Sequence, residues 1–99
     1  MQITIDGREI ICEEDFYKKF YEQLGLPEWC GKNLDALWDV LTGMVSRPID
    51  IFWINTEYSK KNLPRYREIF SLLKEAEVRD IKLGREEKIN FITDDKNIV

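Results

Sequence analysis

Histidine is absent from this 99-residue chain. It is the side chain that most often acts as a general base near neutral pH. Its absence excludes Ser-His and Cys-His nucleophilic arrangements, and it leaves carboxylates, lysine and tyrosine as the remaining candidates for acid–base chemistry. Two cysteines without any imidazole also make a weak zinc site, so we expect no metal and no other cofactor.

Cysteine and long apolar runs are scarce as well. The chain opens Met-Gln-Ile-Thr-Ile-Asp-Gly-Arg, without a basic segment followed by an apolar stretch, so we expect no signal peptide and a cytoplasmic location. In that compartment Cys12 and Cys30 are predicted to be free thiols, with a structural disulfide as the alternative. No run of about 18 or more apolar residues occurs, so the sequence predicts no membrane span.

An excess of positive charge is also lacking. Fifteen Lys and Arg residues stand against 19 Asp and Glu, which gives a net charge of −4. This balance disfavours nonspecific binding to nucleic acid or to anionic membrane surfaces, and it favours a basic partner. With 43% apolar and 12% aromatic residues, the composition is that of an ordinary globular protein, and we expect one domain over residues 1–99.

The hydrophobic pattern alternates between strand and helix periods. Strands are predicted at residues 2–5, 49–54 and 88–93, and helices at residues 13–24, 34–42 and 65–79. This alternation predicts right-handed βαβ units, and hence an α/β fold with a small parallel sheet. The apolar run at 49–54 is typical of a strand buried on both faces. Residues 55–64 are predicted to be a loop and residues 94–99 a loose tail, with Asp94 and Asp95 in solvent.

The helix predicted after Asn33 carries two carboxylates on one side. Asn33 is a good N-cap residue, and Asp35 and Asp39 are four residues apart, so their side chains point the same way. Asp35 lies in the first turn, where its negative charge would interact favourably with the helix dipole whatever its function. Asp39 would be an ordinary solvated residue if no partner binds there. A core face is predicted beside the two aspartates, formed by Leu34, Leu37, Trp38 and Leu41.

One segment, from Leu26 to Gly43, holds a set of residues that recurs in a known family: Pro27, Glu28, Gly31, Asn33, Leu34, Asp35, Ala36, Leu37, Trp38, Asp39, Leu41, Thr42 and Gly43. With these residues the segment resembles the signature of the barstar family, the bacterial intracellular inhibitors of secreted ribonucleases. The resemblance implies a three-stranded parallel sheet packed with helices, a protein that is not an enzyme, and a partner that is a secreted bacterial ribonuclease or nuclease toxin with a basic active site.

The resemblance also implies a set of partner contacts. Asp39 is expected to be the main anchor, in a phosphate site of the ribonuclease, and Asp35 the second anionic contact. The chain departs from the family pattern at Trp29 and Cys30, where two tyrosines are common, and at Met44, where an aromatic residue is common. The other expected contacts are Trp29, Cys30, Asn33, Trp38, Thr42, Gly43, Met44 and Glu75.

Two other functions remain open at this stage. The departures from the family pattern suit an immunity protein or antitoxin against a different nuclease. Basic and aromatic residues also alternate through residues 58–67, as in some RNA-binding segments. That second alternative would make the chain a small RNA-binding α/β domain that uses Lys60, Lys61, Arg65 and Arg67, with Tyr58 and Tyr66.

Overall fold

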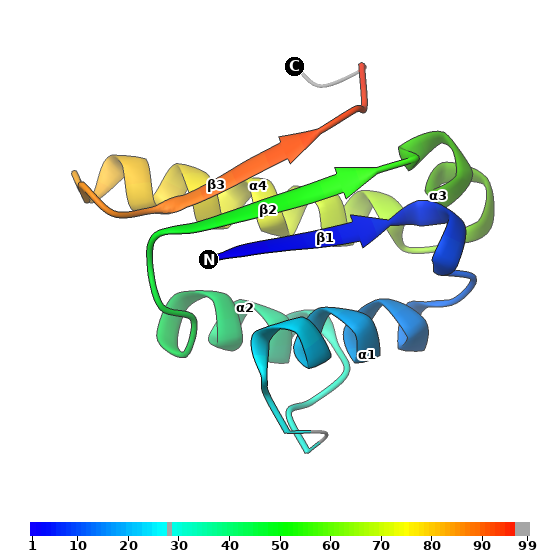
Figure 1. The fold of residues 1–99 in the computed structure, drawn as a ribbon, viewed down its shortest axis with the longest axis horizontal. Coiled ribbons are helices and arrows are strands. Elements are labelled where there is room, and N and C mark those ends of the chain that lie inside the picture. Colours follow the sequence, from blue (N-terminus) through cyan, green and yellow to red (C-terminus); the bar gives the residue numbers. More distant parts are fainter. Residues whose placement is uncertain (28, 97–99) are drawn as a thin grey trace.

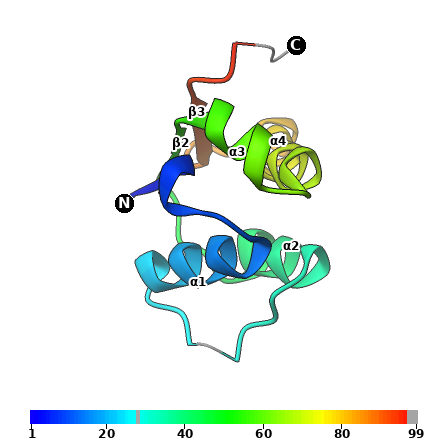
Figure 2. The same cartoon turned by 90° about the vertical axis from the view of Figure 1, so that its right-hand side faces the viewer.

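A three-stranded parallel sheet with helices against one face organises the computed structural model (Figures 1 and 2). The strands lie in the order β1 (Gln2–Asp6), β2 (Ile49–Ile54) and β3 (Ile89–Thr93). The helices are α1 (Glu13–Leu24), α2 (Leu34–Gly43), α3 (Thr56–Asn62) and α4 (Tyr66–Lys82), and a short 3₁₀ turn η1 (Gly7–Glu9) follows β1. The α/β fold and its small parallel sheet are therefore as predicted.

The structure describes residues 1–27 and 29–96, so Glu28 and the last three residues of the predicted tail lie outside it. Within these ranges, no helix has the length and apolar character needed to cross a membrane.

The sheet is covered on one face only. On one face, Ile3 and Ile5 of β1 and Ile51 and Trp53 of β2 are buried against the helices, whereas Phe52 on the opposite face is only partly buried. The prediction that β2 is buried on both faces is therefore wrong. The prediction rested on the apolar run of β2. A strand is buried on both faces only if helices cover both faces of the sheet, and here all the helices pack on the same face.

Trp53 joins the helices to the sheet. Its ring stacks on Phe16 of α1 with centroids 5.4 Å apart, and it meets Tyr66 of α4 edge-on at 5.0 Å. Its indole Nε1 donates a buried hydrogen bond of 3.0 Å to Ser59 Oγ of α3. One fully buried side chain thus contacts three helices, which is consistent with the large contribution that buried aromatic residues make to a core.

Residues 55–64 are not a loop, because α3 occupies most of them. Asn55 takes a left-handed conformation, with φ of 55°, and the helix begins at the next residue. The Asp94 carboxylate then accepts hydrogen bonds from Asn55 N–H at 2.7 Å, Thr56 N–H at 3.2 Å and the Thr56 hydroxyl at 2.6 Å. The group that satisfies the start of α3 therefore comes from the other end of the chain, where a local pattern cannot reveal it.

The first residues of the predicted tail are also held in place. Asp95 accepts a hydrogen bond of 2.7 Å from the Tyr66 hydroxyl and one of 2.9 Å from Lys60 Nζ. The expectation that Asp94 and Asp95 lie loose in solvent is therefore wrong. Both carboxylates join the end of β3 to the α3–α4 region.

Replacing Asp94 with alanine is expected to lower the free energy of unfolding by about 1–2 kcal/mol, because it removes the acceptor at the start of α3. Urea denaturation measures this loss. Asp50→Ala is the matched control. Among the described residues the Asp50 carboxylate accepts a bond only from the exposed Asn90 amide on the open sheet face, at 3.0 Å, and its loss should cost under about 0.5 kcal/mol. Equal unfolding midpoints for the two variants would contradict the capping role of Asp94.

Candidate functional site

The start of α2 is set by its own sequence. Asn33 Oδ1 accepts a hydrogen bond of 2.8 Å from Ala36 N–H, which confirms Asn33 as the N-cap residue. Leu37 and Leu41 are fully buried, as predicted, but Leu34 and Trp38 are only partly buried, and Val40 takes the remaining core position at 2% exposure. The buried face of α2 is therefore rotated toward Val40, and the side that carries Leu34 and Trp38 is left beside α4.

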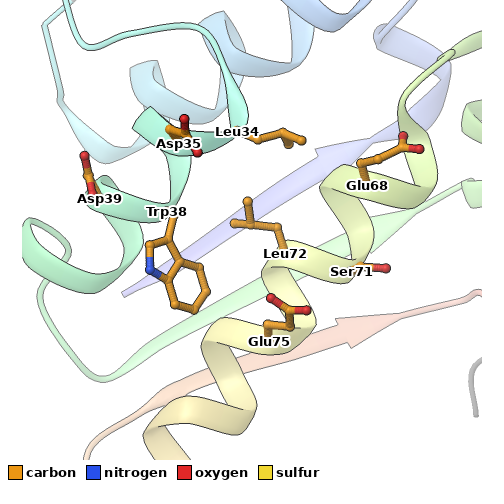
Figure 3. A pocket seen from close by; sticks show the side chains of 8 residues that line it. All are labelled: Leu34, Asp35, Trp38, Asp39, Glu68, Ser71, Leu72 and Glu75. Carbon is orange, nitrogen blue, oxygen red and sulfur yellow. The ribbon is translucent and has the colours of Figure 1, made fainter.

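A groove of about 420 Å³ lies between α2 and α4 (Figure 3). Its apolar part is formed by Leu34, Trp38 and Leu72, and acidic side chains surround this part. The full lining is Leu34, Asp35, Trp38 and Asp39 from α2 with Glu68, Ser71, Leu72 and Glu75 from α4. Tertiary packing thus brings Glu75 to the same surface as the two aspartates of α2.

Among the residues that the structure describes, no cation lies beside the four carboxylates of this groove. No Lys or Arg lines the groove, and every ion pair found among residues 1–27 and 29–96 uses other carboxylates. Asp35, Asp39, Glu68 and Glu75 are all exposed, and Asp35 and Asp39 project from the same side of α2 (Figure 3). Unpaired charges of one sign around a concave surface create a negative potential that attracts a basic partner.

The loop before α2 places an aromatic side chain at the surface. Trp29 is 80% exposed, whereas its neighbour Cys30 is 6% exposed and belongs to the hydrophobic core. Cys30 N–H donates to Pro27 O at 3.1 Å, which closes the turn that contains Trp29. Cys30 was expected on the contact surface, but its side chain is packed beneath that surface. Cys12 and Cys30 are both free thiols, as predicted.

Three contacts hold this loop against the rest of the molecule. The Tyr21 hydroxyl donates to Gly31 O at 2.7 Å, and Lys32 Nζ lies 3.2 Å from Glu14 Oε1. Burial, together with the nearby Cys30 thiol, raises the pKa of Tyr21 to about 12, so the hydroxyl keeps the proton that it donates. Gly31 packs so closely on α2 that a Cβ there would lie 2.9 Å from the Ala36 Cβ. Glycine at this position is required by that close approach.

Tyr21→Phe is expected to free the loop without unfolding the protein. The loss of one hydrogen bond should lower the free energy of unfolding by about 1 kcal/mol. It should also speed amide hydrogen exchange at Cys30 and Lys32. Tyr17→Phe is the matched control, because the Tyr17 hydroxyl donates to Glu13 within α1, at 3.1 Å, and makes no hydrogen bond to the described residues of the loop. Equal rates of amide hydrogen exchange at Cys30 and Lys32 in the two variants would show that the Tyr21 hydroxyl does not hold the loop.

The other residues expected at the site lie at the end of α2. The Thr42 hydroxyl donates to Trp38 O at 2.8 Å, Gly43 is exposed, and Met44 is 49% exposed. Glu68, Ser71 and Leu72 also line the groove and were not predicted. Their spacing from Glu75 was a signal, because residues three, four and seven positions before it lie on the same side of a helix.

Three of the six basic and aromatic residues of the 58–67 segment are held by other parts of the molecule, and the other three, Tyr58, Lys61 and Arg67, are exposed. Lys60 pairs with Asp95 at 2.9 Å, Arg65 lies 3.7 Å from Glu13, and Tyr66 is buried. A hollow of about 600 Å³ beside them contains both signs of charge, since Lys60 and Arg67 line it together with Glu68 and Asp95. This arrangement lacks the continuous positive surface that single-stranded nucleic acid requires.

Comparison with known proteins agrees with the fold. The family model described as "Barstar (barnase inhibitor)" matches residues 1–94. The chain is also similar to the protein named "Putative ribonuclease inhibitor YrdF" of Bacillus subtilis (strain 168). The two are 36% identical over 77 residues, which cover 77% of this chain and 85% of that protein. The chain therefore belongs to the barstar family.

Proposed function

We propose that this protein inhibits a secreted bacterial ribonuclease by placing the acidic side of α2, and the loop before it, in the basic active site of the enzyme. A ribonuclease binds a polyanion, so its active site gathers cationic side chains around phosphate positions. A carboxylate offered there takes the place of a phosphate, and opposite charges both speed association and slow dissociation. The single observation that carries this proposal is the groove on a chain of the barstar family, whose four carboxylates have no cation partner among the described residues.

Asp39 is the proposed anchor, with Asp35 as the second anionic contact. Neither residue has a cation partner among the described residues, and Asp39 lies beyond the first turn of α2, so the helix dipole gives it little stabilisation. Two like charges four residues apart also cost the free helix a few tenths of a kcal/mol. A basic partner would remove that cost on binding.

The remaining contacts surround these two carboxylates. Glu75 adds an acidic group from α4, and Trp29 supplies an exposed aromatic ring of the kind that anchors many interfaces. Cys30 supports the loop from beneath, so its part is indirect. The other proposed contacts are Asn33 at the helix start, Trp38 in the groove, and Thr42, Gly43 and Met44 at the helix end.

Titration of the protein into barnase, with RNA cleavage as the readout, tests the proposal directly. We expect stoichiometric inhibition that weakens as salt rises from about 0.05 to 0.5 M, because salt screens the charges that steer association. Activity that persists at micromolar concentrations of the protein would contradict inhibition of a barnase-like enzyme.

A second candidate is an immunity protein against a different nuclease toxin. The observation that favours it is the surface beside the aspartates. Trp29, where a tyrosine is common in the family, is 80% exposed, and Met44, where an aromatic residue is common, is 49% exposed. These side chains would change the shape of the contact while keeping it apolar. Co-purification from the native host, followed by a nuclease assay of the bound protein, distinguishes the two candidates by the enzyme recovered.

A further inference from the structure

Among the described residues, a single side chain covers the outer edge of β1. Gln23, in the last turn of α1, accepts a hydrogen bond from Thr4 N–H at 2.9 Å and donates one from Nε2 to Thr4 O at 2.7 Å. A residue on a neighbouring antiparallel strand would make this same pair of bonds to Thr4. The amide of Gln23 therefore occupies the place of a fourth strand.

Successive residues of β1 direct their backbone N–H and C=O groups alternately toward β2 and toward the outer edge. Asp50 N–H of β2 donates to Met1 O at 2.9 Å, and β1 and β2 are parallel with Ile3 opposite Ile51. The backbone groups of Ile3 and Ile5 consequently point toward β2, and those of Gln2, Thr4 and Asp6 point away from it. Thr4, at the centre of this outward set, is the residue that Gln23 covers.

Space for another chain exists beside this edge. A hollow of about 410 Å³ runs between β1 and α1, lined by Thr4, Ile5 and Asp6 from the strand and by Lys19, Glu22 and Gln23 from the helix. Since Gln23 is exposed, its two hydrogen bonds compete with water and contribute little net stability. The cover over β1 is therefore weak.

The opposite edge of the sheet is closed more firmly. Ile89 N–H of β3 donates to Asp80 at 2.9 Å, and Phe91 N–H donates to Glu77 at 2.7 Å. Asp80 is fully buried and is held by Arg47 in an ion pair of 3.0 Å. In the part of the molecule that the structure describes, β1 is therefore the only edge strand that is covered by one exposed side chain.

We propose that the β1 edge is a pairing surface for a second copy of this chain, and that Gln23 keeps it closed. The sequence of β1, Gln-Ile-Thr-Ile-Asp, is self-complementary about Thr4. In an antiparallel pair, Thr4 of each copy replaces the amide of Gln23, Gln2 faces Asp6 of the other copy, and Ile3 faces its Ile5 on the covered side. Such a pair is two-fold symmetric, so it stops at a dimer.

Analytical ultracentrifugation of Gln23→Ala tests this proposal. Relative to the wild-type protein, we expect the dimer dissociation constant to fall by about tenfold or more. Glu22→Ala is the matched control, since Glu22 lines the same hollow but makes no bond to β1 and should leave the protein monomeric. In Gln23→Ala, a second change of Thr4→Pro removes the outward N–H of the edge strand and should restore the monomer.

Amide exchange at Thr4 gives a second readout. In Gln23→Ala the Thr4 amide should exchange freely in dilute solution and become protected as the concentration rises. Should this variant fail to fold by circular dichroism, Gln23→Met keeps the length of the side chain without its amide. A folded variant that stays monomeric with concentration-independent exchange at Thr4 overturns the proposal. A wild-type protein that dimerises as tightly as the variant, or a Glu22→Ala variant that dimerises, overturns it too.

Discussion

Replacing Asp39 with alanine is expected to weaken binding of the target ribonuclease by about 2–5 kcal/mol, roughly 30- to 5,000-fold in Kd. The Asp39 carboxylate has no partner among the described residues of the free protein, so the cost arises in the complex, where cations of the enzyme would lose their counter-charge. The fold should not suffer. Alanine favours the helix, and the repulsion between Asp35 and Asp39 disappears, so the free energy of unfolding should stay constant or rise by a few tenths of a kcal/mol.

Stopped-flow and calorimetric measurements of this variant distinguish a direct contact of Asp39 in the complex from long-range electrostatic steering of association. Loss of a contact within the complex should appear mainly as faster dissociation. Glu22→Ala is the control, because it removes the same charge from an exposed position of α1, away from the groove, and should change the association rate only slightly. If Asp39→Ala bound the ribonuclease as tightly as the wild-type protein, Asp39 would not be the anchor.

The largest loss of stability is expected from Asp80→Asn, at about 3–5 kcal/mol. Asp80 is fully buried and accepts bonds from Arg47 Nε at 3.0 Å, Arg47 Nη2 at 3.2 Å and Ile89 N–H at 2.9 Å. These bonds join the segment before β2, the helix α4 and the edge of β3. An uncharged amide would leave the Arg47 guanidinium, whose side chain is 9% exposed, without its counter-charge.

Urea denaturation of Asp80→Asn checks this value. Lys32→Met is the control, because it breaks the Lys32–Glu14 pair, 3.2 Å apart, in which the two side chains are 39% and 73% exposed. Such an exposed pair should contribute less than about 1 kcal/mol. A loss for Asp80→Asn no larger than that for Lys32→Met would contradict a structural role for the buried pair.

The same carboxylates predict how stability depends on pH. Burial alone would raise the pKa of Asp80 and that of Asp94. The bonds from Arg47 and Ile89 to Asp80, and those from Thr56 and Asn55 to Asp94, outweigh burial and hold both pKa values below the ordinary range. The unfolded chain, with an aspartate pKa of about 3.9, then takes up protons first as pH falls.

Stability from these two groups is therefore fully present above about pH 5 and is lost as pH falls through the pKa values of the folded state. Unfolding midpoints measured between about pH 7 and 2.5 should decline at the acid end. Asp80→Asn should show a shallower decline than the wild-type protein, since it has one fewer carboxylate to protonate.

Short-range features of the sequence were enough to predict α1, α2 and the parallel sheet. The cap of α2 joins Asn33 to Ala36, three residues apart, so the pattern that encodes it is local. The common direction of Asp35 and Asp39 follows from helical geometry alone. The contiguous match from Leu26 to Gly43 carried the resemblance to the family that the comparisons then confirmed.

Only the tertiary structure decided the features that depend on distant partners. The start of α3 depends on Asp94, thirty-eight residues along the chain from Thr56. Burial of Cys30, and the open face of the sheet beside Phe52, depend on where the helices pack. The groove exists because α4 lies beside α2 and brings Glu75 to the aspartates, which no periodicity within either helix could show. A local pattern reports what a segment can bury or bond by itself, whereas these features depend on which segment becomes its neighbour.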